Sequence, residues 1–454
     1  MKLASFFVLI AILNSKEQTL NGIIYDKLTK TPIPYVHISL SNNVGTISNK
    51  DGEFRLIWGD FTTEQQNLHF SAVGYRTLTL PLSDSILNTY LEVKLMPSIT
   101  ILDDVLITSE VKADSAILIM QKVLKNINKN YPKHKYGIEA FYREANISDD
   151  VYSRLIEAQI FIADKGYNKP IETTEMNVLQ MRKAEDNRNI SWRQSLFEWL
   201  YMKNGVFKTL ANDRVKLSTQ YYNFTEFIEN KNGWIQFEKR GQEGSIRFLT
   251  DEFIEGCNWE IKDIIKNEND TTYVLKYRVI SKNEQSFFGR IGQGIVYVAK
   301  DDWGVKEIRS EVEKPEGTPY LQLDYTLKDS RAYYKTIIRY QKYQGNYYLS
   351  YIKSESIGTN SQSLFGGRDR GLFKETKGRL GKIYQENELF VTRILPYKKV
   401  SKKNKMDKED DLYNVDVKND EAFWATYNYP MLNPLTDKMK NDLKNSYGEL
   451  FIKD

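Results

Sequence analysis

The chain has 454 residues, more than one ordinary hydrophobic core accommodates, so two or three domains are expected. Its 64 basic and 60 acidic residues give a net charge of +4, which provides no concentrated basic surface and argues against nucleic-acid binding. The single cysteine, Cys257, excludes an intramolecular disulfide and a zinc site built from several cysteines, and we expect it to be a small buried residue.

The N-terminal residues have the composition of a signal peptide. Lys2 precedes an apolar run from Leu3 to Leu13. This run is too short to cross a bilayer as a helix, which needs about 20 residues, so we predict a signal peptide over residues 1–15 that is removed on export. The expected location is the periplasm or the outer membrane, with peripheral rather than helical membrane association.

Short β-type runs follow one another closely between Thr19 and Met96. They are Gly22–Tyr25, Val36–Leu40, Glu53–Ile57, Asn67–Ala72, Arg76–Leu80 and Leu91–Leu95. Regular short strands with turn signals between them predict a small β-sandwich over residues 19–96. Asp51-Gly52 supplies the positive φ that a tight turn requires, so a hairpin is expected to lead into Glu53–Ile57.

This region also carries a specific pattern of turn and strand residues. The pattern comprises Gly22, Asp26, Pro32, Pro34, Val36–Leu40, Gly45-Thr46 and Asp51-Gly52-Glu53-Phe54, with Ser71–Tyr75 and Arg76–Leu80 further on. It resembles the carboxypeptidase-like regulatory domain, which implies a prealbumin-like β-sandwich. Phe141–Glu144 and Glu421–Asn428 resemble blocks of exported Bacteroidota-type proteins in which this domain precedes an uncharacterised β-rich region.

Residues 97–112 are predicted to be a linker strand. It contains Leu102, Asp103, Asp104, Val105, Leu106 and Ile107. This stretch resembles the energy-coupling segment that follows the same domain in TonB-dependent outer-membrane receptors, with Asp104 in place of a glutamate. The alternative is an ordinary strand that joins two domains, since such alternation is common in strands.

Residues 113–395 are predicted to form a large antiparallel sheet with one covering helix, which spans residues 114–130. In that helix, apolar residues recur at i, i+3 and i+4, while Lys122, Lys125 and Lys129 lie on the other side. The predicted strands are Ile138–Ala145, Tyr152–Ala163, Ser245–Thr250, Thr272–Ser281, Gly294–Lys300, Trp303–Val312, Tyr333–Lys342, Tyr347–Ile357 and Ile383–Ile394. Aromatic residues make up 13% of the chain, which suits half-buried strands, so the fold class is expected to be mainly β.

Residues 396–454 are predicted to be a basic linker followed by an aromatic and helical C-terminal segment. The linker contains Lys398 and Lys399 and continues to Lys408, and Thr436–Tyr447 has helical character. Attraction of the linker to anionic head groups is an alternative to a solvated loop, but the acidic residues directly after it oppose that interpretation.

The sequence contains no recognisable set of catalytic or metal-binding residues. The three histidines, His37, His69 and His134, lack a glutamate three residues on, so the ligand set of a zinc carboxypeptidase is absent. The glycine-rich stretches 289–294 and 366–371 do not match a dinucleotide or phosphate loop and are expected to be turns. We therefore predict no catalytic residue, no metal ligand and no cofactor, and leave open whether the protein is an enzyme.

The predicted binding residues are tyrosines of the Tyr333–Lys342 and Tyr347–Ile357 strands. They are Tyr333, Tyr334, Tyr340, Tyr347, Tyr348 and Tyr351. One helix does not cover so broad a sheet, so part of this face is expected to remain an open, tyrosine-lined groove, although core packing is the common role of such rings.

The resulting hypothesis is a non-catalytic binding or assembly protein of the cell envelope, linked to TonB-dependent transport. Its partner would be an envelope protein complex or an apolar or peptide-like ligand. An envelope enzyme with an uncatalogued site is one alternative, and a small outer-membrane barrel is another, since the signal of each barrel strand is weak.

Overall fold

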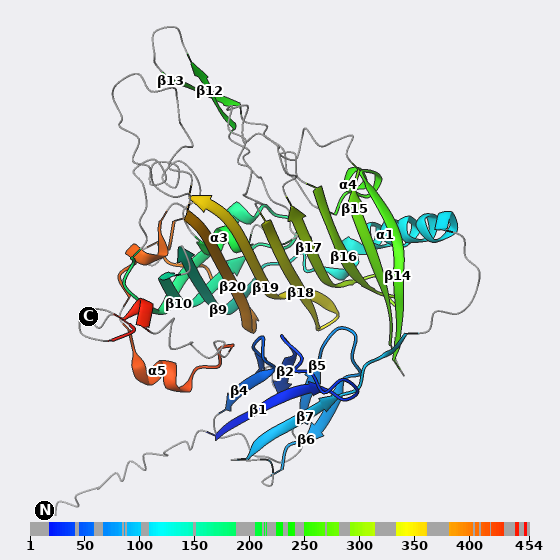
Figure 1. Cartoon of the computed structure of the whole chain (residues 1–454), viewed down its shortest axis with the longest axis horizontal. Helices are drawn as coiled ribbons and strands as arrows, with labels where there is room; N and C mark the ends of the chain where they lie inside the picture. The colour runs from blue at the N-terminus through cyan, green and yellow to red at the C-terminus, as the bar shows by residue number, and fades with distance from the viewer. Residues whose placement is uncertain are drawn as a thin grey trace, which may run out of the picture. The chain divides into compact units, whose positions relative to one another are not determined.

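The computed structural model describes residues 18–40, 45–58, 67–83, 86, 89–100, 109–148, 151–187, 205–210, 213, 215, 224–229, 235–240, 249–267, 270–280, 291–313, 333–360, 381–402, 405–407, 410–417, 419–430, 441–444 and 449–451. The chain divides into two compact units. Unit 1 comprises Met1–Pro97 and Glu421–Asn433, and unit 2 comprises Ser98–Asp420 and Pro434–Asp454. Strands dominate both units, which confirms the mainly β fold class (Figure 1).

Unit 1 contains seven strands in two sheets. The strands are β1 Gln18–Asp26, β2 His37–Leu40, β3 Gly45–Ile47, β4 Glu53–Trp58, β5 Asn67–Ser71, β6 Leu78–Pro81 and β7 Tyr90–Leu95. One sheet has the order β4-β1-β7, with β1 antiparallel to β4 and parallel to β7, and the other has the order β3-β2-β5-β6. Side chains from both sheets, including Ile24, Ile38, Phe54 and Phe70, form one buried core. The sandwich expected from the sequence is therefore confirmed.

The turn before β4 has the geometry that its residues predict. Gly52 has a φ of 78°, which favours glycine, and a Cβ at this position would lie 2.6 Å from the carbonyl oxygen of Ile24. Asn49 Oδ1 accepts hydrogen bonds from the backbone N–H groups of Asp51 and Glu53 at 3.0 and 2.9 Å. This side chain therefore fixes the turn locally.

The C-terminal part of unit 1 closes the edge of β4. Helix α5, Glu421–Thr426, is followed by Asn428, whose amide bonds to both backbone groups of Ile57. Ile57 N–H donates to Asn428 Oδ1 at 2.6 Å, and Asn428 Nδ2 donates to Ile57 O at 2.5 Å. The Arg55 guanidinium lies 4.9 Å from the centre of the Tyr429 ring. The side-chain amide thus occupies backbone groups that an edge strand otherwise leaves unpaired.

Unit 2 is built on one antiparallel sheet of eleven strands in the order β11-β10-β9-β20-β19-β18-β17-β16-β15-β14-β8. The strands are β8 Ile99–Thr100, β9 Tyr136–Ser148, β10 Val151–Asp164, β11 Glu175–Lys183, β14 Cys257–Asn267, β15 Asp270–Val279, β16 Ile291–Ala299, β17 Val305–Glu313, β18 Tyr333–Tyr343, β19 Asn346–Asn360 and β20 Gly381–Pro396. A separate hairpin consists of β12 Phe224–Glu229 and β13 Ile235–Arg240. The helical segments are α1 Ser109–Asn130, η1 Ile171–Thr173, α3 Gly205–Leu210, α4 Asp251–Glu255 and η3 Leu412–Asn414.

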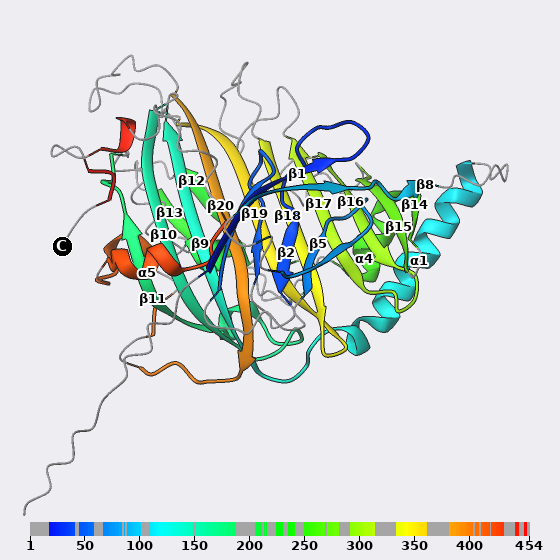
Figure 2. The same ribbon diagram turned by 90° about the horizontal axis from the view of Figure 1, so that it is seen from below.

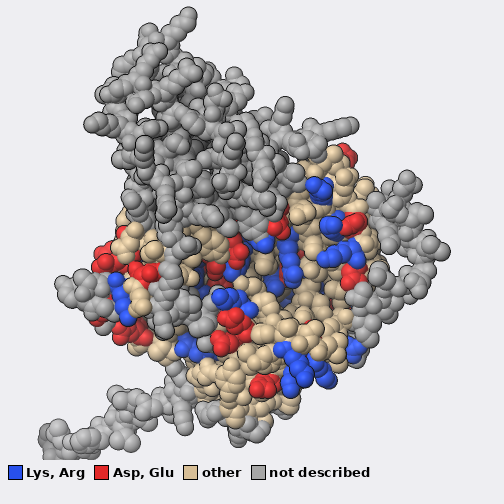
Figure 3. All heavy atoms as spheres, viewed as in Figure 1, with Lys and Arg blue, Asp and Glu red and all other residues tan. Residues whose placement is uncertain are grey.

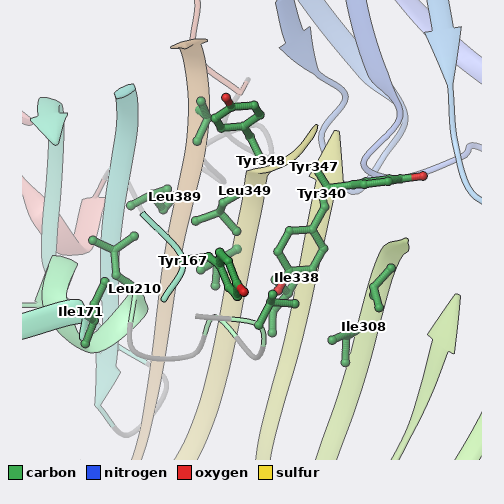
Figure 4. Packing of buried hydrophobic residues seen from close by; sticks show 14 of the residues in the cluster. Tyr167, Ile171, Leu210, Ile308, Ile338, Tyr340, Tyr347, Tyr348, Leu349 and Leu389 are labelled. Carbon is green, nitrogen blue, oxygen red and sulfur yellow. The ribbon is translucent and has the colours of Figure 1, made fainter. Parts of the chain in front are cut away.

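One face of this sheet, called the inner face below, packs against several covering segments. Helix α1 contacts β14, α4 and β19, and α3 contacts β19, β20 and η1. Figure 2 shows α1 beside β14 near one edge of the sheet. Ala116, Ile119, Met120, Val123 and Ile127 of α1 belong to the same buried core as the inner-face residues of the strands. Figure 4 shows Ile308 of β17, Ile338 of β18 and Leu389 of β20, and Tyr167, Ile171 and Leu210 on the segments that cover this face. More than one element therefore covers the inner face.

The opposite, outer face carries a line of charged side chains and one tyrosine across successive strands, called the charge ladder below. Its members are Arg182, Glu157, Arg143, Glu388, Tyr351, Arg339 and Glu307. Arg143 lies 2.8 Å from both Glu157 and Glu388, and Tyr351 OH donates to Glu388 at 2.8 Å. Glu157 and Glu307 are fully buried, and each contacts two arginines.

Several segments of unit 2 differ from the sequence expectations. Thr250, predicted to end a strand, instead accepts a hydrogen bond from Phe253 N–H at 3.2 Å and so caps α4. β11 and β14 were not predicted, because polar residues interrupt their apolar pattern. Each of these strands also has a register shift in its pairing. Most of the predicted Thr436–Tyr447 helix lies outside the described residues.

Candidate binding site on the inner face

Four of the six predicted binding tyrosines are core residues. Tyr340, Tyr347, Tyr348 and Tyr351 have exposed fractions of 7%, 5%, 4% and 1%. The first three belong to the hydrophobic core that includes the inner-face residues, whereas Tyr351 belongs to the outer-face charge ladder, so the structure does not bring the set together. The backbones of Tyr333 and Tyr334 begin β18, and their side chains lie outside the described residues.

Polar partners hold these rings in place. Tyr340 OH donates to Asp213 at 2.6 Å, and Tyr347 OH donates to Asp302 at 3.1 Å. Burial, reinforced by the nearby aspartates, raises the pKa of both phenols. The Tyr131 ring lies 5.7 Å from Tyr340 and 6.0 Å from Tyr347, centre to centre. These residues form an aromatic cluster rather than an exposed surface.

The expectation of an exposed groove is therefore wrong at these four positions. It assumed one covering helix, but α3, α4 and η1 add to α1, and the turn containing Tyr167 also covers the rings. Whether a ligand contacts any of these tyrosines remains a prediction.

The inner face contains an apolar row in which each residue is the direct cross-strand neighbour of the next. From β14 to β11 it comprises Ile261, Leu275, Val296, Ile308, Ile338, Ile352, Leu389, Tyr142, Ala158 and Met181. Because side chains alternate between faces along a strand, residues two positions away lie on the same face. The pairing register therefore identifies which residues form the next row on the inner face.

That adjacent row is polar over five strands and is called the polar row below. It consists of Ser310, Thr336, Ser354, Asn387 and Glu144. All except Asn387 are at least nine-tenths buried. A row of polar side chains beside a row of apolar ones gives the inner face an amphipathic pattern.

Two hydroxyls of the polar row, called the hydroxyl pair below, lack hydrogen-bond partners. Ser310 Oγ and Thr336 Oγ1 are buried, and neither has a partner among the described residues. The two residues are directly opposite each other in the β17–β18 pairing. A buried hydroxyl without a partner costs roughly 1–3 kcal/mol. Neither hydroxyl therefore adds a hydrogen bond to the described part of the fold.

The two ends of the polar row are closed differently. At one end, a Cβ on Gly205, the first residue of α3, would lie 2.2 Å from Tyr142 OH and 2.5 Å from Glu144 Oε2, so α3 packs directly on these side chains. At the other end, the Tyr277 ring lies over Gly294, where a Cβ would meet the ring at 2.7 Å. Gly294 is the cross-strand neighbour of Ser310. An aromatic ring thus borders the hydroxyl pair.

Beyond Glu144 lies a buried charged group centred on Arg154. Arg154 Nε lies 3.1 Å from Glu144 Oε1, and Nη1 lies 3.0 Å from carboxylate oxygens of Asp186 and Asp411. These carboxylates raise the pKa of the guanidinium despite the opposing effect of burial. Asn146, the cross-strand neighbour of Arg154, is buried, and its Oδ1 has no partner among the residues described.

Other sequence predictions have separate outcomes. The coupling-box-like residues Leu102–Ile107 lie outside the described residues, and Cys257 is buried, which raises its pKa to about 12. Within the described ranges, no group of three or more His, Cys, Asp or Glu residues has the geometry of a metal site. No described helix has both the length and the apolar composition that crossing a membrane requires.

In unit 1, the structure brings together two residues of the regulatory-domain pattern. Tyr75 OH donates to Asp26 Oδ2 at 2.9 Å, and Asp26 Oδ1 accepts from the N–H groups of Leu28 and Thr29. Hydrogen bonds from backbone N–H groups, with that from Tyr75, lower the Asp26 pKa although burial opposes them. These two residues therefore fix the turn after β1.

Comparison with known proteins finds a family match in the N-terminal part of the chain. Residues 20–107 match the family model of the CarboxypepD_reg-like domain, which confirms the resemblance seen in the sequence. The chain has no match among curated proteins.

Three solved structures each overlap 64% of the chain. A domain described as an outer membrane lipoprotein-sorting protein from Vibrio parahaemolyticus is 9% identical, with a TM-score of 0.25 and 96% of that chain covered. A LolA superfamily protein from Nitrosomonas europaea is 12% identical, with a TM-score of 0.23 and 96% covered. A DUF1329 family protein from Desulfovibrio piger is 8% identical, with a TM-score of 0.23 and 95% covered. These scores are too low to support an inference about function.

Proposed function

We propose that the protein is a non-catalytic binding protein of the cell envelope that holds an amphipathic molecule on the inner face of unit 2. The apolar row would contact the ligand's apolar chain, and the polar row would contact its polar group. The observation that carries this proposal is the buried hydroxyl pair, Ser310 and Thr336, which has no partner among the described side chains and backbone groups. A ligand would supply the missing hydrogen bonds.

A ligand can reach this face only if a covering segment moves, and α1 has suitable attachments. The described polar contacts of α1 with other elements lie in its C-terminal half, where Asn130 Nδ2 donates to Asp302 O at 2.7 Å and Lys122 lies 4.3 Å from the Trp303 ring centre. Its N-terminal half packs through apolar side chains such as Ala116 and Met120. Such packing is non-directional, so α1 can pivot about its C-terminal end without breaking any sheet hydrogen bond.

The test is fluorescence quenching by 12-bromododecan-1-ol and 12-bromododecanoic acid. Trp259 lies in the same row as the hydroxyl pair, with three strand spacings, or roughly 14 Å, between it and Ser310. Bromine quenches a tryptophan on contact, so either probe should quench the wild-type protein more than the Trp259→Phe variant.

The matched control is Trp424→Phe, which changes a buried tryptophan of unit 1 and should leave the quenching as in the wild type. If Trp259→Phe is quenched as strongly as the wild type by both probes, the ligand does not lie on the inner face.

The proposal places the protein outside the cytoplasm. Lys2 and the apolar run after it support export, and mature protein from the envelope should begin between about Asn14 and Thr19. We further propose that the segment Leu102–Ile107 links the protein to a TonB-dependent complex. Crosslinking from this segment in intact envelopes should capture such a complex, and loss of capture on its deletion is the expected control result.

A further inference from the structure

We infer that the polar group of the ligand is uncharged and bears hydroxyls, which rests on the proposed function. The polar row offers hydrogen-bonding groups that suit such a ligand. Ser310 and Thr336 each present a hydroxyl that can donate and accept, and neither is used by a described partner. A hydroxyl of the ligand is complementary to both roles at once.

The rest of the polar row provides acceptors. Tyr142 OH lies 3.2 Å from Glu144 Oε2 and 3.3 Å from Asn387 Oδ1, but a phenol has one proton and donates to only one of them at a time. Asn146 Oδ1, on the same face two residues from Glu144, is also without a described partner. The row therefore has acceptor capacity that a hydrogen-bond donor of the ligand would satisfy.

The charges beside the row oppose an anionic group. Three carboxylates, from Glu144, Asp186 and Asp411, surround the single guanidinium of Arg154. The other nearby cation, Lys183, donates to the backbone oxygen of Tyr413 at 2.7 Å. A phosphate or carboxylate placed here would lie beside these three carboxylates in a largely buried environment, where its desolvation is costly.

A cationic group is also disfavoured where the hydroxyl pair lies. Ser310 and Thr336 are four and three strands from Glu144 in the row, with Ser354 and Asn387 between Thr336 and Glu144. The Tyr142 and Glu144 end is covered by α3, so an ammonium group cannot pair with that carboxylate without displacing the helix. The uncharged Tyr277 ring borders Ser310 on the other side. The surroundings of the hydroxyl pair therefore suit a neutral, hydroxyl-bearing group.

The experiment compares three amphiphiles with the same twelve-carbon chain by isothermal titration below their aggregation concentrations: 1-monolauroylglycerol, laurate and dodecylamine. The full-length mature protein should bind 1-monolauroylglycerol at least tenfold more tightly than either charged probe. The double variant S310A/T336V should lose about tenfold in affinity for 1-monolauroylglycerol and leave the affinities for the charged probes unchanged.

The matched control is Thr46→Val in unit 1, a threonine that is likewise buried with no described partner for its hydroxyl. It should bind all three probes as the wild type does. Tighter or equal binding of laurate or dodecylamine overturns the head-group inference while leaving the proposed function standing. If none of the three binds and the brominated probes do not quench Trp259, the proposed function fails with it.

Discussion

Replacing Thr336 with valine should stabilise the ligand-free protein. Valine keeps the branched shape that packs in β18 but removes a buried hydroxyl that has no described partner. Leaving such a group unpaired costs roughly 1–3 kcal/mol, so Thr336→Val should raise the free energy of unfolding by about 1 kcal/mol. For a unit of this size, that corresponds to an increase of roughly 2 °C in the melting temperature.

The matched comparison is Thr272→Val in β15 of the same sheet. Thr272 is also buried, but its Oγ1 accepts a hydrogen bond from Lys306 Nζ at 2.9 Å. Removing it should lower the free energy of unfolding by about 1–2 kcal/mol, since the lysine loses a partner. The two Thr→Val variants should therefore shift the melting temperature in opposite directions.

Differential scanning calorimetry of the full chain measures both shifts, and Thr272→Val identifies which transition belongs to unit 2. If Thr336→Val lowers the melting temperature as Thr272→Val does, the Thr336 hydroxyl is hydrogen-bonded in the native protein. The Thr336 hydroxyl would then have a partner within the protein and would not be kept for a ligand.

Three further predictions concern the charge ladder and unit 1. Glu307→Gln should lower the free energy of unfolding by roughly 3 kcal/mol, because it removes the buried carboxylate that both Arg309 and Arg339 contact. Glu311→Gln, on the same strand face, should change the free energy of unfolding by less than about 1 kcal/mol, and equal effects of the two substitutions in urea unfolding would contradict this. Burial raises the pKa of Glu157 and Glu307, but the arginines outweigh it and lower both below 4.5, so their stabilisation is full above that pH and is lost as the pH falls through the lowered values. Acid unfolding followed by circular dichroism should be shallower in Glu157→Gln, and an unchanged slope would oppose the assignment. Asn428→Ala should lower the melting temperature of unit 1, since it removes two hydrogen bonds to Ile57, and an unchanged value would show that β4 does not need this contact.

Unit 1 was predictable because its information is local in the sequence. Asp51-Gly52 specifies a turn, and Asp26 binds the N–H groups of the residues that follow it. Each such signal acts within a few residues, so the sandwich could be predicted without knowing which strands pair. The contact between Asn428 and Ile57 joins residues from opposite ends of the chain and leaves no local signal.

The helix and most strands of unit 2 were predictable from periodicity, but the candidate site was not. Ser310, Thr336 and Ser354 are ordinary residues in their own strands, and they form a row only through the register of β17, β18 and β19. The tyrosines were conspicuous in the sequence, but their exposure depended on covering segments such as α3, which has only six residues. A short segment gives too little periodicity to detect.

Buried polar groups are satisfied to different extents on the two faces of the large sheet. On the outer face, buried Glu157, Arg143 and Glu307 each have a charged partner within hydrogen-bond distance. On the inner face of the same strands, the Ser310 and Thr336 hydroxyls have none among the described residues. A sheet able to satisfy full charges on one face can satisfy two hydroxyls on the other at little cost, or replace them with apolar residues that continue the adjacent row. The hydroxyl pair is therefore explained better by a molecule that binds there than by the stability of the fold.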